Sequence, residues 1–206
     1  MTAREKIHSG DLYLPTDDGM FEEQQRYMEL LYEFNHTRPS EAERRTALLR
    51  EMFAEFGEGS FIEPPLRANW SGHNVHFGKN VFANFNLTMV DDTHIYVGDY
   101  TMIAPNVTIT VASHPLDPEL RQKNYQYNRP VRIGRSCWIG MGAMILPGVT
   151  IGDGAVIGAG SVVTHDIPAN TLAMGTPCRV VREIGEYDRE YYRKGKRIDY
   201  QELFGG

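Results

Sequence analysis

One histidine lies where a side chain could carry out chemistry. His114 follows the residues VAS and precedes Pro115, where a repetitive stretch gives way to a segment rich in proline and polar residues. Histidine titrates near neutral pH, so its imidazole is largely neutral in the cell and can take a proton from a hydroxyl group. A loop histidine hydrogen-bonded to backbone is the alternative, since no Ser/His/Asp motif and no nucleophilic cysteine context accompanies it. His114 is therefore a candidate general base.

The other residue types that bind metals favour structural roles. His73 and His76 form an H-x-x-H pair, but on an extended chain this spacing sends the two side chains to opposite faces. Cys137 and Cys178 are the only two cysteines, and they belong to no closely spaced ligand motif. We expect no metal site and no disulfide, with Cys137 as a reduced core residue.

A candidate base needs a rigid scaffold, and a six-residue repeat predicts one. Isoleucine or valine recurs at every sixth position, at Ile133, Ile139, Ile145, Ile151, Ile157 and Val163. A smaller residue lies two positions before each of the last five, at Cys137, Ala143, Val149, Ala155 and Ser161. No α-helix has this period, whereas a parallel β-helix with three short faces stacks equivalent positions in columns. We therefore predict a mainly β fold whose branched and compact repeat residues point inward.

Two helices are predicted before this coil. Residues 21–34 and 41–56 carry apolar residues at helical spacing. Ser40 with Glu43 reads as a capping box that opens the second helix, and Gly57 is a natural stop.

A long loop interrupts the repeats and is a natural location for a site. Ile109 and Ile133 are separated by a whole number of six-residue units, yet residues 112–130 have no inward pattern. We predict an extruded loop after which the register resumes, and loops on rigid scaffolds often carry function. The predicted divisions are an N-terminal helical segment 1–60, a β-helix 61–183 and a C-terminal tail 184–206. An open coil end exposes unpaired backbone, so we expect a homo-oligomer with the helices or the tail covering an end.

Composition limits the partners. The chain has 206 residues, 41% of them hydrophobic, and a formal net charge of -6, which argues against general nucleic-acid binding. The sequence has no leader-like start and no apolar run of about 18 residues or more. We expect a cytoplasmic protein that binds neither nucleic acid nor membrane.

Five runs of the sequence carry a resemblance to a known family. They are LYEFNHTRPSE (31–41), FANFNLTMVDD (82–92), IAPNVTITVASHP (103–115), WIGMGAMILPGVTIGDGAVIGAGSVVTHDIP (138–168) and GTPCRVVREI (175–184). These runs resemble the hexapeptide-repeat sugar O-acetyltransferases, which include galactoside, maltose and nodulation acetyltransferases. The similarity extends over nearly the whole chain. It implies a left-handed parallel β-helix, a homotrimer with sites between subunits, and acetyl transfer from acetyl-CoA to a sugar hydroxyl, expected at the 6-position of a galactoside, glucoside or maltose-like acceptor.

The resemblance also assigns expected roles to single residues. His114 matches the catalytic base, which deprotonates the sugar hydroxyl as it attacks the thioester, without an acyl-enzyme. Four positions match residues that contact the acceptor sugar: Asp17, Arg26, Asn84 and Asp92. The backbone N–H of Met141 matches the donor to the oxyanion. The expected contacts of the acetyl-CoA co-substrate are Ala159, Thr164, His165, Arg179 and Arg182. From the residues alone, Asn84 could equally form an amide ladder along the coil, and Asp92 could be a turn residue.

The sequence departs from the family at two of these sites. His165 stands where the galactoside enzyme has a lysine, which weakens one cationic contact with CoA. Trp70, Ser71 and Gly72 stand where relatives have an S/D-Y-G motif in the acceptor pocket, so a bulky indole could narrow or redirect that pocket.

Three other functions remain open at this stage. The same scaffold could acetylate a hydroxyl of an antibiotic, or it could be a binding β-helix without activity. A hexapeptide-repeat carbonic anhydrase is the third, and it requires three histidines around a metal.

Overall fold

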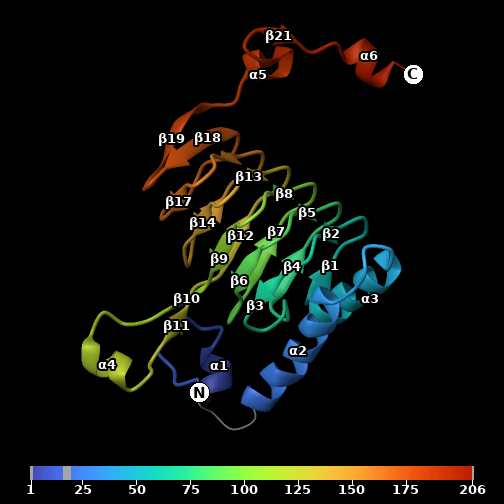
Figure 1. Cartoon of the computed structure of the whole chain (residues 1–206). Helices are drawn as coiled ribbons and strands as arrows, with labels where there is room; N and C mark the ends of the chain where they lie inside the picture. Colours follow the sequence, from blue (N-terminus) through green and yellow to red (C-terminus); the bar gives the residue numbers. More distant parts are fainter. Residues whose placement is uncertain (1, 16–19, 206) are drawn as a thin grey trace.

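Short strands wind into a coil with three flat faces, each of them a parallel sheet (Figure 1). The computed structural model describes residues 2–15 and 20–205. The first face consists of β1 (Glu55–Phe56), β4 (Val75–Phe77), β7 (Ile95–Val97), β12 (Val131–Ile133) and β15 (Thr150–Ile151). The second consists of β2 (Phe61–Ile62), β5 (Phe82–Ala83), β8 (Met102–Ile103), β13 (Trp138–Ile139), β16 (Val156–Ile157), β18 (Thr171–Gly175) and the antiparallel β19 (Cys178–Glu183). The third consists of β3 (Arg67–Ala68), β6 (Thr88–Val90), β9 (Thr108–Thr110), β14 (Met144–Ile145) and β17 (Val162–Val163).

The predicted inward columns are confirmed. Ile139 pairs with Ile103 on one side and Ile157 on the other, while Ile145 pairs with Ile109 and Val163. Every branched and every compact repeat residue named above is at most 3% exposed. Because each column stacks side chains of similar shape, the buried residues form one continuous apolar cluster through the coil.

Glycine follows the branched residue where two coils approach most closely. A Cβ atom on Gly140 would lie 2.6 Å from both the Ile157 carbonyl oxygen and the Ala159 amide nitrogen of the next coil. Only a residue without a side chain lets the N–H at this position donate to the Ile157 carbonyl oxygen at the observed 2.8 Å. The glycines of the repeat are therefore dictated by the spacing between coils.

The two predicted helices exist, but the second is shorter than expected. Helix α2 spans Met20–Asn35 and α3 spans Ala42–Met52. The chain turns extended at Phe53, and β1 pairs with β4, so the first strand of the coil begins at Glu55 rather than at residue 61. The reason is tertiary: Phe53 and Phe56 both pack their rings against Phe77 of the coil.

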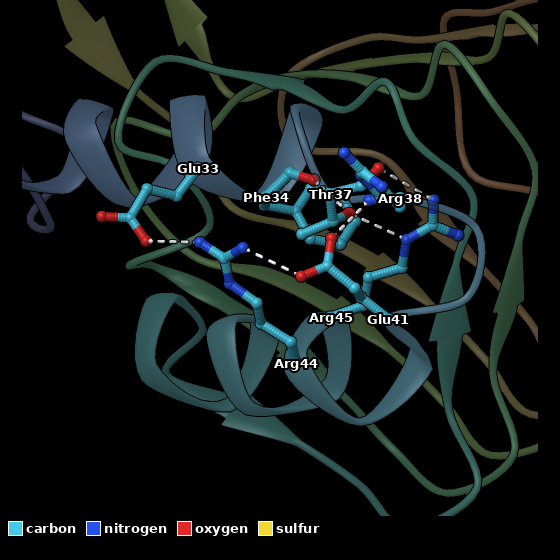
Figure 2. Close-up of polar contacts among 7 residues, drawn as sticks. All are labelled: Glu33, Phe34, Thr37, Arg38, Glu41, Arg44 and Arg45. Carbon is cyan, nitrogen blue, oxygen red and sulfur yellow. Dashed lines mark hydrogen bonds and ion pairs between the residues drawn. The ribbon is translucent and has the colours of Figure 1, made fainter.

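The predicted capping box is wrong. Glu41 is the residue before α3, and its carboxylate accepts the Arg38 N–H at 2.7 Å instead of capping the helix itself. Figure 2 shows the polar contacts that join the two helices around it. Arg45, only 7% exposed, donates to the Thr37 hydroxyl at 2.8 Å, and Thr37 in turn donates to Phe34 at 2.7 Å. These bonds fix the angle between α2 and α3.

The helices cover the first end of the coil, as expected. Phe34, Leu49 and Met52 are at most 1% exposed and join the same apolar cluster as Ile62 and Leu66. The tail does not fold over the opposite end. It extends away from the coil (Figure 1) and contains α5 (Glu186–Glu190), β20 (Tyr191–Arg193), β21 (Lys196–Arg197) and α6 (Tyr200–Phe204).

The predicted loop leaves the coil and returns without changing its register. Strand β7 pairs with β12, and β9 pairs with β14, as they would in an uninterrupted coil. The loop has its own structure, with β10 (Ala112–Ser113) antiparallel to β11 (Tyr127–Asn128) and the helix α4 (Pro118–Gln122) between them.

The N-terminal segment packs against this loop. It begins with α1 (Ala3–Lys6), and Tyr13 forms a β-bridge with Gln126. Asn128 donates its side-chain amide to the Ile7 carbonyl and the Tyr13 hydroxyl, both at 2.9 Å. No helix in the described ranges is long and apolar enough to cross a membrane.

Candidate active site

His114 lies just beyond β10, exposed at the base of the loop. Its Nδ1 atom is 3.0 Å from the carbonyl oxygen of Tyr125, on the returning side of the loop. A carbonyl oxygen can only accept, so this contact assigns the ring proton to Nδ1 and leaves the lone pair of Nε2 available. The ring is therefore bonded to backbone through Nδ1, as the alternative reading expected, while Nε2 stays available for a substrate.

Asp92 lines a cavity of about 100 Å³ beside this loop. Asp92 is 9% exposed, and its carboxylate accepts a hydrogen bond from the Asn69 side-chain amide at 3.2 Å. Burial raises the pKa of Asp92, although the hydrogen bond from Asn69 opposes the shift. Among the described residues, those that line the cavity are Ile7, Tyr13, Pro15, Met20, Phe21, Gln24, Trp70, Asp92 and Gln126. Because Gln126 follows Tyr125 directly, the cavity adjoins the backbone that holds His114.

Asp91, which the sequence analysis did not single out, is the turn residue of the pair. Its two carboxylate oxygens accept the backbone N–H groups of Trp70 and Gly72, each at 2.8 Å. The side chain is fully buried, and this burial raises the pKa of Asp91 to about 6. Asp91 thereby fixes the backbone of the turn that carries Trp70.

This buried carboxyl predicts a pH-dependent stability. The pKa of this carboxyl is 3.8 in the unfolded chain and about 6 in the folded one, so its protonation stabilises the folded state. The stabilisation is present in full below pH 3.8. That contribution is lost as the pH rises through about 6, and it amounts to on the order of 3 kcal/mol. From pH 4 to pH 7 we expect the unfolding free energy of the wild type to fall relative to that of Asp91→Asn, whose side chain does not titrate. Urea unfolding at each pH measures it, and a difference independent of pH contradicts the assignment.

A second group of predicted residues lies where the second face turns into the third. Asn84, Met141 and Ala159 occupy this corner in different coils. The N–H groups of Met141 and Ala159 donate no hydrogen bond to any residue that the structure describes, whereas Gly140 and Gly142 donate to Ile157 and Pro105. The corner therefore presents two free backbone donors.

The amide of Asn84 does not form the ladder that its repeat position allowed. Its Oδ1 accepts the N–H of Phe85 at 2.9 Å, and its Nδ2 has no partner within residues 2–15 and 20–205. The ladder belongs to Asn86 and Asn106, whose side chains are 3.1 Å apart. Asn84 is therefore oriented by its own backbone and keeps both amide hydrogens available.

One chain holds its predicted site residues at two different corners. Asp92 and His114 lie where the third face turns into the first, with the whole width of the third face between them and Met141. A face of this coil is about five residues wide, or about 15 Å at the usual rise of a strand. A general base and an oxyanion donor must both lie about 3 Å from the reacting group. His114 and Met141 of one chain are too far apart for that.

The candidate contacts of CoA lie toward the last coils. Thr164 and His165 follow β17 at the same corner as His114, and the Thr164 hydroxyl is 2.8 Å from His165 Nδ1. Arg179 and Arg182 lie exposed on β19. Arg182 pairs with both carboxylate oxygens of Asp188 in the tail, each at 2.7 Å, so its guanidinium already has an anionic partner.

The remaining predictions have separate outcomes. Arg26 is exposed on α2, and Asp17 lies outside the described residues. His73 stacks on Tyr27, while His76 stacks on Tyr96. Within the described residues, no group of three or more His, Cys, Asp or Glu side chains could hold a metal. Both cysteines are buried, free thiols.

Comparison with known proteins decides the family. The model of the maltose acetyltransferase hexapeptide capping motif matches residues 6–57, and that of the bacterial transferase hexapeptide (six repeats) matches residues 130–165. Galactoside O-acetyltransferase of Lactococcus lactis is 50% identical over 198 residues, which cover 96% of this chain and 96% of that protein. The chain belongs to the hexapeptide-repeat sugar O-acetyltransferases.

Two solved structures of this family of sugar O-acetyltransferases agree with the fold. A galactoside acetyltransferase in complex with coenzyme A superimposes with a TM-score of 0.93 at 49% identity, covering 97% of this chain and 99% of that one. A maltose O-acetyltransferase from Clostridium difficile gives 0.88 at 45% identity, with 90% and 99% covered. These findings confirm the predicted family, the left-handed parallel β-helix and the enzyme class. The coenzyme A in the first structure agrees with the predicted co-substrate.

The sequence alone did not predict all of the residues that line the cavity beside Asp92. Tyr13 and Gln126 line it from segments that are 113 residues apart, and no spacing or motif joins them. A groove of about 520 Å³ lies between α2 and the first strands of the third face. None of the predicted site residues that the structure describes lines this groove, so its size is not a guide to the chemistry.

Proposed function

We propose that this chain transfers the acetyl group of acetyl-CoA directly to a hydroxyl group of a sugar, with His114 as the general base. The observation that carries this proposal is the contact of His114 Nδ1 with the Tyr125 carbonyl at 3.0 Å. It orients the ring and keeps the Nε2 lone pair free for a substrate proton.

Each proton and bond of the reaction has a destination. Nε2 of His114 takes the hydroxyl proton while the sugar oxygen bonds to the thioester carbon, and the thioester oxygen becomes an oxyanion. The carbon–sulfur bond then breaks as the C=O double bond re-forms, and the imidazolium returns the proton to the sulfur of CoA. No acyl-enzyme forms on this route, so both substrates must be bound together.

The backbone N–H of Met141 is our candidate for the oxyanion donor. It has no acceptor in the described chain, and the close packing of Gly140 against the next coil holds it rigidly. A preorganised donor of this kind lowers a barrier by about 3 kcal/mol. The neighbouring free N–H of Ala159 is suited to an amide carbonyl of the pantetheine arm.

The separation of the two corners supports a homotrimer with shared sites. His114 and Asp92 of one chain would meet Met141 and Asn84 of its neighbour in the cleft between two coils. A cyclic assembly repeats this head-to-tail contact until the ring closes.

An apolar column on the second face supports the same assembly. Met102 and Trp138 are neighbours in register and are 54% and 56% exposed. Phe61 and Phe82 continue the column, with ring planes only 4° apart. Exposed apolar surface of this extent is typical of an interface between proteins.

The other end of CoA would lie along the last coils. Thr164 and His165 can donate hydrogen bonds, and Arg179 and Arg182 can pair with phosphates. Because Asp188 already holds Arg182, a phosphate must displace that carboxylate or share the guanidinium with it. His165 adds less positive charge here than a lysine would.

For the acceptor we propose the 6-hydroxyl of a hexose, bound by Asp92 and Asn84 with help from Arg26 and Asp17. A primary hydroxyl projects from the sugar ring and can reach Nε2 of His114 with the least crowding. The carboxylate and the amide can accept from and donate to the remaining hydroxyl groups.

Release of the CoA thiol tests this function. We expect release from acetyl-CoA in the presence of hexoses, galactosides or maltose, and not with a panel of hydroxyl-bearing antibiotics. NMR of the product identifies the acetylated position. Transfer to antibiotics alone would favour the xenobiotic alternative, and an absence of CoA binding by calorimetry would favour a β-helix without activity.

A further inference from the structure

Trp70 forms a wall between two cavities. The cavity of about 100 Å³ that contains Asp92 lies on one side, and a cavity of about 190 Å³ lined by His73 and Asn74 lies on the other. Ile7 and Met20 line both cavities together with Trp70. The indole is 7% exposed and is the largest side chain of this small apolar cluster.

The wall is held by the backbone beneath it. Asp91 accepts the N–H groups of Trp70 and Gly72, and Ser71 between them adopts a left-handed φ of 58°. A Cβ atom on Gly72 would lie 2.4 Å from the Phe53 ring, so the turn packs directly against the core. The backbone that carries the indole therefore cannot shift without breaking buried hydrogen bonds.

The indole nitrogen is a second, independent observation. Trp70 Nε1 is buried and has no hydrogen-bond partner among the residues that the structure describes. Trp70 and Asp92 line the same cavity. Buried donors are rarely left unpaired, and hydrogen bonds of an active site often tighten only when the substrate binds.

The volume on the Asp92 side suits a small ligand. Pockets for larger organic ligands usually begin at roughly 300 Å³, and the two cavities would together approach that volume if the indole were absent. Without Trp70, Asp92 would face one continuous space between the N-terminal segment and the coil.

We propose that Trp70 determines acceptor specificity: its ring makes the pocket favour compact, single-ring sugars over larger acceptors such as maltose, and its unpaired N–H donates to the carboxylate of Asp92 when the sugar binds, which orients that carboxylate toward the sugar. The inference rests on the proposed function, because it requires that the cavity beside Asp92 receives the acceptor. Trp70 is a positioning residue in this account and takes no part in the proton transfer.

Three variants separate the size of the ring from its donor. Trp70→Ser and Trp70→Leu remove the wall, and the second retains more apolar packing in case the first does not fold. Trp70→Phe keeps most of the volume and removes the N–H. Met28→Ser is the matched control, since Met28 is an apolar residue of α2 that lines the separate large groove.

The measurement is kcat/KM for free hexoses, for maltose and for a nitrophenyl galactoside, with CoA affinity from calorimetry. For Trp70→Ser or Trp70→Leu we expect the ratio of kcat/KM for bulky acceptors to kcat/KM for compact acceptors to rise by about tenfold to a hundredfold. For Trp70→Phe we expect the acceptor KM to rise by about threefold to tenfold with the ratio unchanged. CoA affinity should be unaffected in all three, and Met28→Ser should keep the wild-type ratio.

The contrary results are distinct. An unchanged ratio in folded Trp70→Leu that still binds CoA overturns the size limit. An unchanged acceptor KM in Trp70→Phe overturns the role of the N–H. If the wild type acetylates no sugar at all, the proposed function fails together with this inference, whereas the first two results leave that function intact.

Discussion

Replacing His114 with alanine is expected to lower kcat by about two to four powers of ten, because a positioned general base contributes that much to a proton transfer. The sugar hydroxyl would then have to lose its proton to water. The affinity for CoA should remain near that of the wild type, since no part of the predicted CoA contact set involves the imidazole. Steady-state thiol release and calorimetry measure the two effects separately.

The control for this variant is His36→Ala. His36 is an exposed histidine just after α2, 2.7 Å from the Tyr32 carbonyl through its Nδ1, so it copies the ring contact of His114 outside the site. We expect wild-type kcat for this variant. Near-native turnover in a folded His114→Ala protein would rule out the general-base mechanism.

Mixing two inactive chains is expected to restore activity if the sites are shared between subunits. His114→Ala damages one corner of the chain, and Asn84→Ala damages the other. In trimers assembled from equal amounts of both, about a quarter of the clefts combine two intact corners. Co-expressed and purified mixed trimers should therefore show about a quarter of the wild-type thiol release.

A second mixture distinguishes shared sites from simple averaging. The second mixture combines His114→Ala with Asp92→Asn, and both substitutions damage the corner where the third face turns into the first. Every cleft of that mixed trimer therefore contains a damaged copy of this corner. We expect no restoration from this pair. No recovery in either mixture, while the separate chains still form trimers, would show that each chain carries a complete site. Equal recovery in both mixtures would show that the single variants are not inactive, and would also contradict the shared site.

The repeat made the coil predictable, because its period is a property of neighbouring residues. Ile133 to Val163 recur at a spacing that no helix or flat sheet has, and all of them are buried. The end of α3 was less predictable, since apolar spacing through Phe53 and Phe56 fits both a helix and a packed strand. Contacts with Phe77 decide between them, and Phe77 is distant in the sequence.

The site was predictable only in part, because much of it also depends on contacts between residues that are distant in the sequence. His114 precedes a proline at the edge of the repeats, which marks it locally. The cavity depends instead on Tyr13, Trp70 and Gln126 meeting in space, and the burial of Asp91 appears only once the turn at Trp70 folds over it. The separation of His114 from Met141 is likewise a property of the three-faced coil.

The loop that carries His114 leaves and re-enters the coil between strands that pair as if it were absent. Scaffold and recognition element are consequently modular. Segments of other lengths and compositions can be exchanged between His114 and Tyr125 as long as these two residues and the β10–β11 ladder are kept. A library of grafted loops on this one solenoid would diversify acceptor preference while the stacked interior continues to supply the stability.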